Sequence, residues 1–588
     1  MGAQHRSRFR KLRSTGLNRR SFLQGSAAAL AVPLLNACGD SGEPLASTPT
    51  PAPGPVPAPV PAPTVAAPKM AAFLHGVASG DPLIDRVILW TRITLDAESV
   101  TAAAMAKVDY VMSLATTLAT PVQTGSFITG AERDYTVKID AAALNSYTTY
   151  YYQFSITLAD GMVIKSAIGR TKTAPKAGDT DRLRMVSASC QSMSYGYFNA
   201  HGAMAVKPDH DVMLFLGDYI YETAAASQIA GRSGIPAKEI TTLEDYRLRH
   251  AQYKTDPDLQ ANHRQIPFIC VWDDHETTNN SYRASADNHT EGPTAEGCWE
   301  ERMGWAIRAY FEWMPIRDNA STAFDAPTAA ACPGAPISGF LPEGNGKVER
   351  NFSYGELVDV IMLDTRLQAR AVQNGTATVT PEQTILGAAQ RERFLAKLGA
   401  STAKWKLVGQ QMTFAPVKAV PLPEAQGGTY LNEDAWDGYR FDRNAVLKHL
   451  GDNAIKNVVF LSGDTHVVTA FDIPVEPNDP TRYNPLTGAG SLAVEFSNSG
   501  IANVGILGEF LMANNPHLKY ANIAERGYLL LDITAARIQG EYFFTGLPTQ
   551  RSAVETFRRA LVCNADSQVL TPGTLPTTGR STAAPLAP

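Results

Sequence analysis

The chain has 588 residues, of which 44% are hydrophobic and 19% charged, and its formal net charge is −5. This length allows two or more domains with their own cores, and the composition excludes a chain that is disordered throughout. The 37 N-terminal residues hold seven Lys/Arg and no Asp/Glu, so 45 basic residues remain against 57 acidic ones, a net charge of −12. A mature protein this acidic lacks the basic surface of a general nucleic-acid binder.

The N-terminus has the features of an export signal. The pair Arg19-Arg20 stands before Phe22-Leu23 and a short apolar stretch, a pattern typical of a twin-arginine signal over residues 1–37. The alternative is an ordinary secretory signal with two neighbouring arginines. The stretch ends in LNAC, which resembles a bacterial lipobox and predicts lipidation of Cys38. The alternative here is cleavage just before an incidental cysteine. Beyond this region no uncharged apolar run reaches about 18 residues, which excludes a multi-span membrane protein.

The mature chain divides into segments of different composition. Residues 38–71 are rich in Pro and Ala and predict a stiff stalk between the lipid and the folded part. Residues 72–175 contain short runs of β-branched and aromatic residues separated by turn signals, which is typical of a β-sandwich. Residues 180–560 alternate apolar strands with helical segments and predict an α/β domain. Residues 564–588 are polar and rich in Pro and Thr, so we expect a disordered tail.

Polar side chains stand at the ends of four predicted strands of the α/β domain. These ends read SCQ at 189–191, GDYIYE at 217–222, DDHE at 273–276 and GDTH at 463–466. Each one alone is typical of helix capping or core packing. Ligand sites of α/β sheets, however, lie outside the carboxyl ends of their strands, so the four loops can converge. Carboxylates, His and Cys brought together would repel or be poorly solvated without a cation.

In this order the motifs GDYIYE, WDDHETTNN and LSGDTH, with SCQ upstream, resemble the PhoD-like (alkaline phosphatase D) family of metallophosphoesterases. GVASGDP (76–82), VILWTR (87–92), LDTR (363–366) and AWDGY (435–439) extend the resemblance over roughly residues 72–545. The resemblance implies an α/β fold: a four-layer α/β/β/α metallophosphoesterase core with two metal sites, preceded by an N-terminal β-sandwich domain.

The resemblance also implies the ligands of the two cations. A ferric ion would be held by four side chains, Cys190, Asp218, Tyr221 and His466. A second cation would share Asp218 and add Asp274 and Asp464, with Asp273 as an alternative to Asp274. Related enzymes commonly have Asn at the position of Asp274 and His at that of Asp464. An oxygen-only ligand set favours Ca²⁺, with Mg²⁺ or Mn²⁺ as alternatives.

Two further side chains of these motifs are candidates for contacts with substrate. His275 is the candidate catalytic residue, because it could contact the phosphoryl oxygen or protonate the leaving group; the alternative is support of the metal ligands. Arg366 could bind a substrate anion or form a buried salt bridge. Among the remaining cysteines, Cys270 is predicted to be buried and free, and Cys298 with Cys332 is the favoured disulfide.

These observations predict an exported phosphate-ester hydrolase that uses a metal-activated hydroxide at an Fe³⁺/Ca²⁺ centre. We expect a periplasmic or cell-surface lipoprotein that meets the twin-arginine export machinery and touches the membrane only through its lipid. Its partner in catalysis would be a phosphate ester, and no nucleic-acid scaffold is expected. The alternatives are a phosphodiesterase or phospholipase with the same centre, or a non-catalytic metal-binding surface lipoprotein.

Overall fold

The computed structural model of the chain describes residues 65, 67–96, 99–100, 105–292, 294–318, 346–503 and 514–588. The predicted export signal, the Cys38 lipidation site and most of the stalk lie outside these residues. In the part of the chain that is described, no helix combines the length and the apolar character needed to cross a bilayer.

The N-terminal strands form the two layers of a β-sandwich. One layer is an antiparallel sheet in the order β10-β8-β5-β6, with β9 beside β8. Its strands are β5 (Met105–Ser113), β6 (Pro121–Gly130), β8 (Thr149–Thr157), β9 (Val163–Lys165) and β10 (Gly169–Lys172). The facing strands are β2 (Val77–Gly80), β3 (Val87–Arg92) and β7 (Thr136–Ala141), and the short strands β1 (Ala71–Ala72) and β4 (Thr94–Leu95) pair beside them.

Alternation along the strands builds the sandwich core. On β8, Tyr150, Tyr152, Phe154 and Ile156 all point inward and pack with residues of β2, β3 and β7 such as Leu89. Successive side chains of a strand point to opposite faces, so every second residue of the YYYQFSI run enters the core. This part of the fold class is confirmed.

The sandwich shares a sheet with the α/β domain. β2 adds in parallel to β13 (Phe268–Cys270), where Gly80 is the partner of Phe268. A Cβ atom on Gly80 would lie 2.1 Å from the Pro315 carbonyl oxygen, so the close approach requires glycine. One sheet therefore runs through both of the segments predicted as domains, 72–175 and 180–560.

In the described residues, two large sheets face each other. The larger has the order β24-β23-β22-β21-β11-β12-β13-β2-β3-β7, and the smaller the order β14-β15-β16-β17-β19-β18-β20. The remaining strands of the larger sheet are β11 (Arg182–Ala188), β12 (Val212–Phe215), β21 (Arg526–Thr534), β22 (Arg537–Thr545), β23 (Glu555–Asn564) and β24 (Leu570–Gly573). Those of the smaller are β14 (Arg350–Tyr354), β15 (Val358–Met362), β16 (Trp405–Gly409), β17 (Val458–Ser462), β18 (Val468–Pro474), β19 (Ser491–Ser497) and β20 (Leu518–Asn522).

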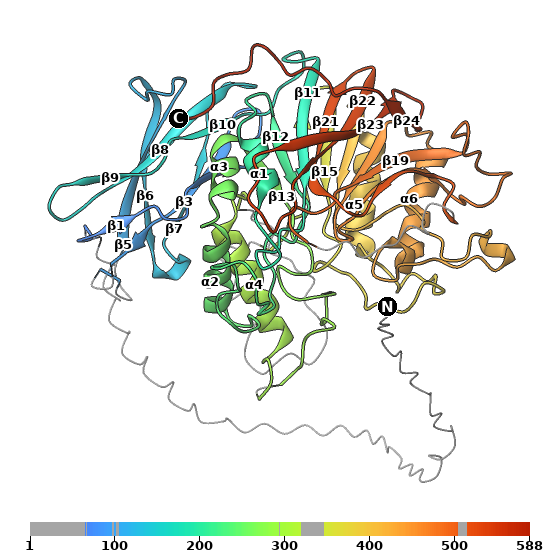
Figure 1. Cartoon of the computed structure of the whole chain (residues 1–588), viewed down its shortest axis with the longest axis horizontal. Helices are drawn as coiled ribbons and strands as arrows, with labels where there is room; N and C mark the ends of the chain where they lie inside the picture. Colours follow the sequence, from blue (N-terminus) through green and yellow to red (C-terminus); the bar gives the residue numbers. More distant parts are fainter. Residues whose placement is uncertain are drawn as a thin grey trace, which may run out of the picture. The chain divides into compact units, whose positions relative to one another are not determined.

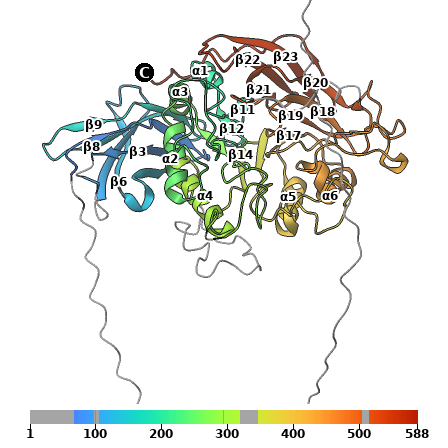
Figure 2. The same ribbon diagram turned by 60° about the horizontal axis from the view of Figure 1, so that its bottom comes forward.

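Helices cover the outer faces of the two sheets. On β17, Val459 and Leu461 belong to the core between the sheets, whereas Val458 and Phe460 pack under α5 (Gly387–Ala400) and α6 (Arg440–Asp452). The other helices, grouped beside the larger sheet in Figure 1, are α1 (Asn199–Ala205), α2 (Leu243–Tyr253), α3 (Pro257–Gln265) and α4 (Trp299–Trp313). The order helix, sheet, sheet, helix is the four-layer core that the resemblance implied (Figure 2).

The C-terminal segment corrects the prediction of a disordered tail at 564–588. β24 pairs with β23, and the chain then runs back to the N-terminal strands (Figure 1). Arg580 forms an ion pair with Asp211, and the Tyr151 hydroxyl donates a hydrogen bond to the Pro585 carbonyl. The polar composition suggested disorder because it offers little to bury, but the partners that order the segment come from distant parts of the chain.

The cysteines agree with the sequence analysis where they are described. Cys270 is buried and free. Cys298 is disulfide-bonded, and its partner lies outside the described residues.

Candidate metal centre

The four polar strand ends meet at one point between the sheets. Cys190 follows β11, Asp218 follows β12, and Asp273-Asp274 follow β13 in the larger sheet, while Asp464 and His466 follow β17 in the smaller one. β11, β12 and β13 are parallel neighbours, so their carboxyl ends lie at the same edge. Ligand atoms lie within 4.8 Å of one another in each of three groups: Cys190, Asp218 and His466; Asp218, Asp274 and His275; Asp273, Asp274 and Asp464.

Four of the residues at this point have an unusual backbone conformation. Cys190, Asp218, Asp464 and His466 have φ between 55° and 61°, in the left-handed region that residues with a side chain rarely adopt. Each such residue costs on the order of 1–3 kcal/mol, and clusters of them occur at functional sites. The backbone therefore turns sharply at each strand end and directs these side chains toward a common centre.

Gly217 allows the turn before Asp218. Its φ is +106°, and a Cβ atom there would lie 2.5 Å from the Cβ of Asp273. The loop after β12 thus passes directly against the loop after β13, an approach that only glycine permits. The motif needs this glycine in order to bring its aspartate beside the DDHE loop.

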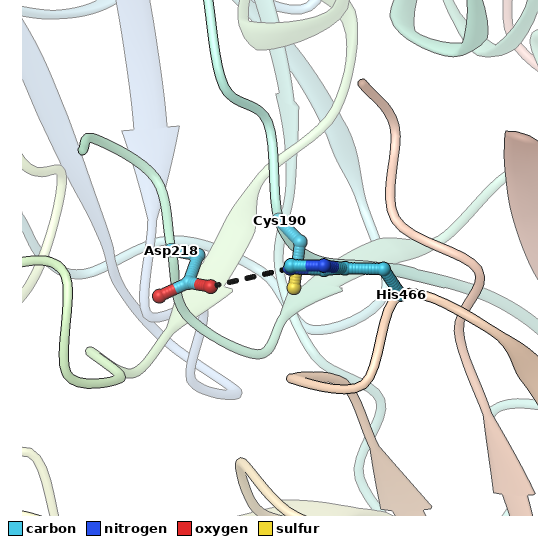
Figure 3. A group of neighbouring side chains, drawn as sticks. All are labelled: Cys190, Asp218 and His466. Atoms are coloured by element: carbon cyan, nitrogen blue, oxygen red, sulfur yellow. Dashed lines mark ion pairs between the residues drawn. The ribbon is translucent and has the colours of Figure 1, made fainter. Parts of the chain in front are cut away.

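Asp218 lies at the centre of the first group. Its carboxylate accepts a hydrogen bond from the Tyr221 hydroxyl at 2.8 Å and lies 3.9 Å from His466 Nε2. Figure 3 shows the Asp218 carboxylate directed toward Cys190 and His466. The Tyr221 hydroxyl is 3.2 Å from His466 Nε2, so the side chains of all four residues predicted for the ferric ion face one another.

The third group, Asp273, Asp274 and Asp464, lies around Arg366. Its guanidinium lies 2.6 Å from Asp273, 3.2 Å from Asp464 and 3.6 Å from Asp274. Arg366 is fully buried. Of the two alternatives for this residue, the buried salt bridge is the one present, and its nitrogens face carboxylates of the protein.

His275 belongs to the second group, together with Asp218 and Asp274. Its Nδ1 is 2.6 Å from Glu222 Oε2, and its ring packs on Tyr221 with the centroids 4.3 Å apart. Burial lowers the pKa of His275, but the carboxylates of Glu222, Asp274 and Asp218 outweigh it, so its pKa is raised well above the ordinary value. These carboxylates therefore favour the protonated form of the imidazole.

Three residues of the site were not identified from the sequence. Glu222 anchors His275, and Glu276 accepts backbone N–H bonds from Asp218 at 3.0 Å and from Asp273 at 2.7 Å, which joins two loops. Asn503 donates to the Tyr221 hydroxyl at 2.6 Å. Both glutamates stand next to predicted site residues, a signal that could have identified them. Asn503 lies far along the chain and carries no such signal.

The sequence profile of "PhoD-like phosphatase" matches residues 185–542, and that of "PhoD-like phosphatase, N-terminal domain" matches residues 59–175. The chain belongs to this family. Members are phosphoric ester hydrolases, and so is this PhoD-like chain. Alkaline phosphatase D of Bacillus subtilis (strain 168) is 30% identical over 524 residues, which are 85% of this chain and 82% of that protein.

Two solved structures are similar to this PhoD-like protein. A structure of PhoD matches with a TM-score of 0.73 and 29% identity, over 86% of this chain and 92% of that one. The purple acid phosphatase PPD1 from yellow lupin seeds matches with a TM-score of 0.50 over 87% of this chain and 78% of that one. At 12% identity, the second match concerns the fold alone.

PhoD-like phosphatases depend on metal ions, and the residues at this point are chemically suited to hold them. Burial and the nearby Asp218 carboxylate raise the pKa values of Cys190 and Tyr221 well above their ordinary ranges. Both groups are therefore protonated unless a cation replaces their protons. Among the described residues, the buried Asp218 Oδ1 has no hydrogen-bond partner. An unpaired buried carboxylate oxygen of this kind is available as a metal ligand.

Proposed function

We propose that this phosphatase works with two cations of different charge. Fe³⁺ would be bound by Cys190, Asp218, Tyr221 and His466. Ca²⁺ would be bound by Asp218, Asp274 and Asp464, in preference to Mg²⁺ or Mn²⁺ because an oxygen-only set of this kind suits Ca²⁺. Phenolate and thiolate together favour a cation of high charge at the first site. Asp218 would be the ligand shared by both ions.

One observation carries the proposal. The ligand atoms of Cys190, Asp218 and His466 lie within 4.8 Å of one another in a buried place, and one oxygen of the central Asp218 lacks a hydrogen-bond partner among the described residues. A buried carboxylate oxygen without a partner costs several kcal/mol unless an ion or water satisfies it. A cation at this point removes the cost and joins the three groups.

The cations and His275 would have different roles in hydrolysis of the phosphate ester. When bound, two cations neutralise the phosphoryl oxygens and lower the pKa of an attacking water. His275, protonated and held by Glu222, would donate a proton to the departing alcohol oxygen. The hydrogen bond to Glu222 at Nδ1 leaves Nε2 as the donor toward the ester.

We further propose that the protein is exported and held at a membrane by a lipid on Cys38. The Arg19-Arg20 pair, the following apolar stretch and the LNAC motif support this location. The disulfide at Cys298 also supports it, because disulfides persist mainly in oxidising compartments.

Metal removal and replacement test the proposed centre. We expect a calcium chelator to abolish hydrolysis of p-nitrophenyl phosphate, and added Ca²⁺ to restore it, because the oxygen-only site releases its ion more readily than the site with Cys and Tyr. Metal analysis should find iron retained throughout. Activity that is unaffected by chelation would contradict the proposed calcium site.

Parallel assays with bis(p-nitrophenyl) phosphate and a phospholipid separate a monoesterase from a diesterase or phospholipase.

Leaving-group dependence tests the role of His275. We expect His275→Asn to slow hydrolysis of glycerol phosphate by about 10²–10⁴-fold, the usual size of general acid catalysis. Hydrolysis of p-nitrophenyl phosphate should fall much less, because nitrophenolate departs without a proton. Glu222→Gln should give the same pattern with a smaller amplitude. Equal losses on both substrates would mean that His275 only supports the metal ligands.

A further inference from the structure

Arg366 crosses the boundary between the two large sheets at the candidate metal centre. It belongs to the loop after β15 of the smaller sheet, where the Asp364 carboxylate accepts the backbone N–H of Arg366 at 2.9 Å and fixes the turn. Its guanidinium reaches Asp273, which follows β13 of the larger sheet. The Arg366 side chain thus connects the two sheets at the candidate metal centre.

All three nitrogens of the guanidinium face carboxylates of the protein. Nε lies 2.6 Å from Asp273, Nη1 lies 2.9 Å from Asp434, and Nη2 lies 3.2 Å from Asp464 and 3.6 Å from Asp274. The side chain is fully buried. Because the guanidinium is buried and each of its nitrogens faces a carboxylate of the protein, Arg366 contacts the site through these carboxylate partners.

The charges around Arg366 do not balance within the protein. Four carboxylates face the guanidinium of Arg366, and a second guanidinium, that of Arg370, also binds Asp434. If all four are ionised, two negative charges remain. The carboxylates are Asp273, Asp274, Asp434 and Asp464.

We propose that Arg366 is a fixed internal cation that holds the carboxylates of the second site together before a divalent ion is bound. This inference rests on the proposed calcium site and deepens it. Buried carboxylates without a counter-ion are poorly solvated and repel one another. The planar fork of Arg366 supplies one permanent positive charge and fixes the positions of three loops, and the divalent ion supplies the remaining charge. Arg366 is a positioning residue in this arrangement.

The test compares thermal unfolding of the full chain in a calcium chelator and in saturating Ca²⁺. In chelator, Arg366→Gln should unfold on the order of 5 °C below the wild type, because the buried carboxylates lose their counter-ion. Calcium should narrow this gap, because it replaces part of the lost charge. The calcium-induced rise in the unfolding temperature is therefore expected to be larger in the variant than in the wild type. Arg366→Lys, which keeps the charge without the fork, should lie between the two.

Arg443→Gln is the matched control. Arg443 of α6 forms a buried ion pair with Asp437, and neither residue belongs to the three groups of potential ligands. Its loss should lower the unfolding temperature by the same amount with and without calcium. This control distinguishes the destabilisation caused by losing any buried arginine from the calcium-dependent destabilisation expected for Arg366.

The outcomes are distinct. If calcium does not raise the unfolding temperature of the wild type, the proposed calcium site is wrong. If it does, and Arg366→Gln shows an equal or smaller rise, only the role of Arg366 is wrong. Should Arg366→Gln fail to fold, the double variant Arg366→Gln/Asp434→Asn removes one carboxylate together with the guanidinium and should fold. Failure of the double variant as well would overturn the counter-ion role, since relief of charge would then not restore the protein.

Discussion

Asp218→Asn is expected to lose both cations and almost all phosphatase activity. The residue is the proposed shared ligand, and an amide supplies neither the charge nor the second anionic oxygen that two cations require. Loss of the cations removes several kcal/mol of transition-state stabilisation. At about 1.4 kcal/mol per tenfold change, kcat/KM should fall by at least ~10³-fold. Turnover of p-nitrophenyl phosphate and metal analysis of the purified variant measure the two effects.

Asp211→Asn serves as the control for this variant. Asp211 directly precedes β12, whereas Asp218 follows it, so the two aspartates flank the same strand. Asp211 is buried and pairs with Lys172 and Arg580. Its loss should reduce stability and leave the metal content and the turnover of the folded protein unchanged. If Asp218→Asn keeps its metals and its activity, the shared-ligand role is wrong.

Tyr221→Phe is expected to lose iron, colour and most of its turnover. A tyrosinate bound to Fe³⁺ gives a visible charge-transfer band, and phenylalanine lacks the oxygen that produces it. The aromatic ring remains to pack on His275, so the change removes one ligand atom with little effect on packing. Activity should fall on the order of 10²-fold, which corresponds to about 3 kcal/mol. Visible spectra and iron analysis of the wild type and the variant check this result.

Tyr354→Phe is the corresponding control. Tyr354 is buried on β14 opposite the first residue of β15, at the end of the smaller sheet away from the metal centre. Its substitution should leave the visible band, the iron content and the turnover as they are. A colourless, iron-free and active wild-type preparation would refute the ferric site altogether, and unchanged values for Tyr221→Phe would remove that residue from it.

Local features of the sequence were sufficient to locate the strand ends of the candidate site. GDYIYE, DDHE and GDTH each follow an apolar run, and four such ends in one α/β domain predict polar side chains at the carboxyl edge of its sheets. The glycine in GDYIYE is also a local signal of a sharp turn, since Gly217 adopts a φ of +106°. These signals placed the side chains that the structure gathers around Asp218.

The partners of those side chains could not be predicted from local features. Arg366 and Asp273 are 93 residues apart, and Asn503 lies 282 residues from Tyr221. Nothing near Arg366 in the chain distinguishes a ligand of substrate from a buried counter-ion. The distinction depends on whether the folded sheets exclude water from its guanidinium, which is a property of packing between distant segments.

By itself, the sequence determined the fold class, the polar residues at the strand ends and the family. Each of these follows from short motifs whose residues are close together in the chain. Only the tertiary structure decided that the sandwich and the α/β domain share a sheet through Gly80, that Arg580 and its neighbours order the C-terminal segment, and that Arg366 faces carboxylates. In each case the stabilising contact joins segments far apart in the chain, and its free energy exists only once both are brought together.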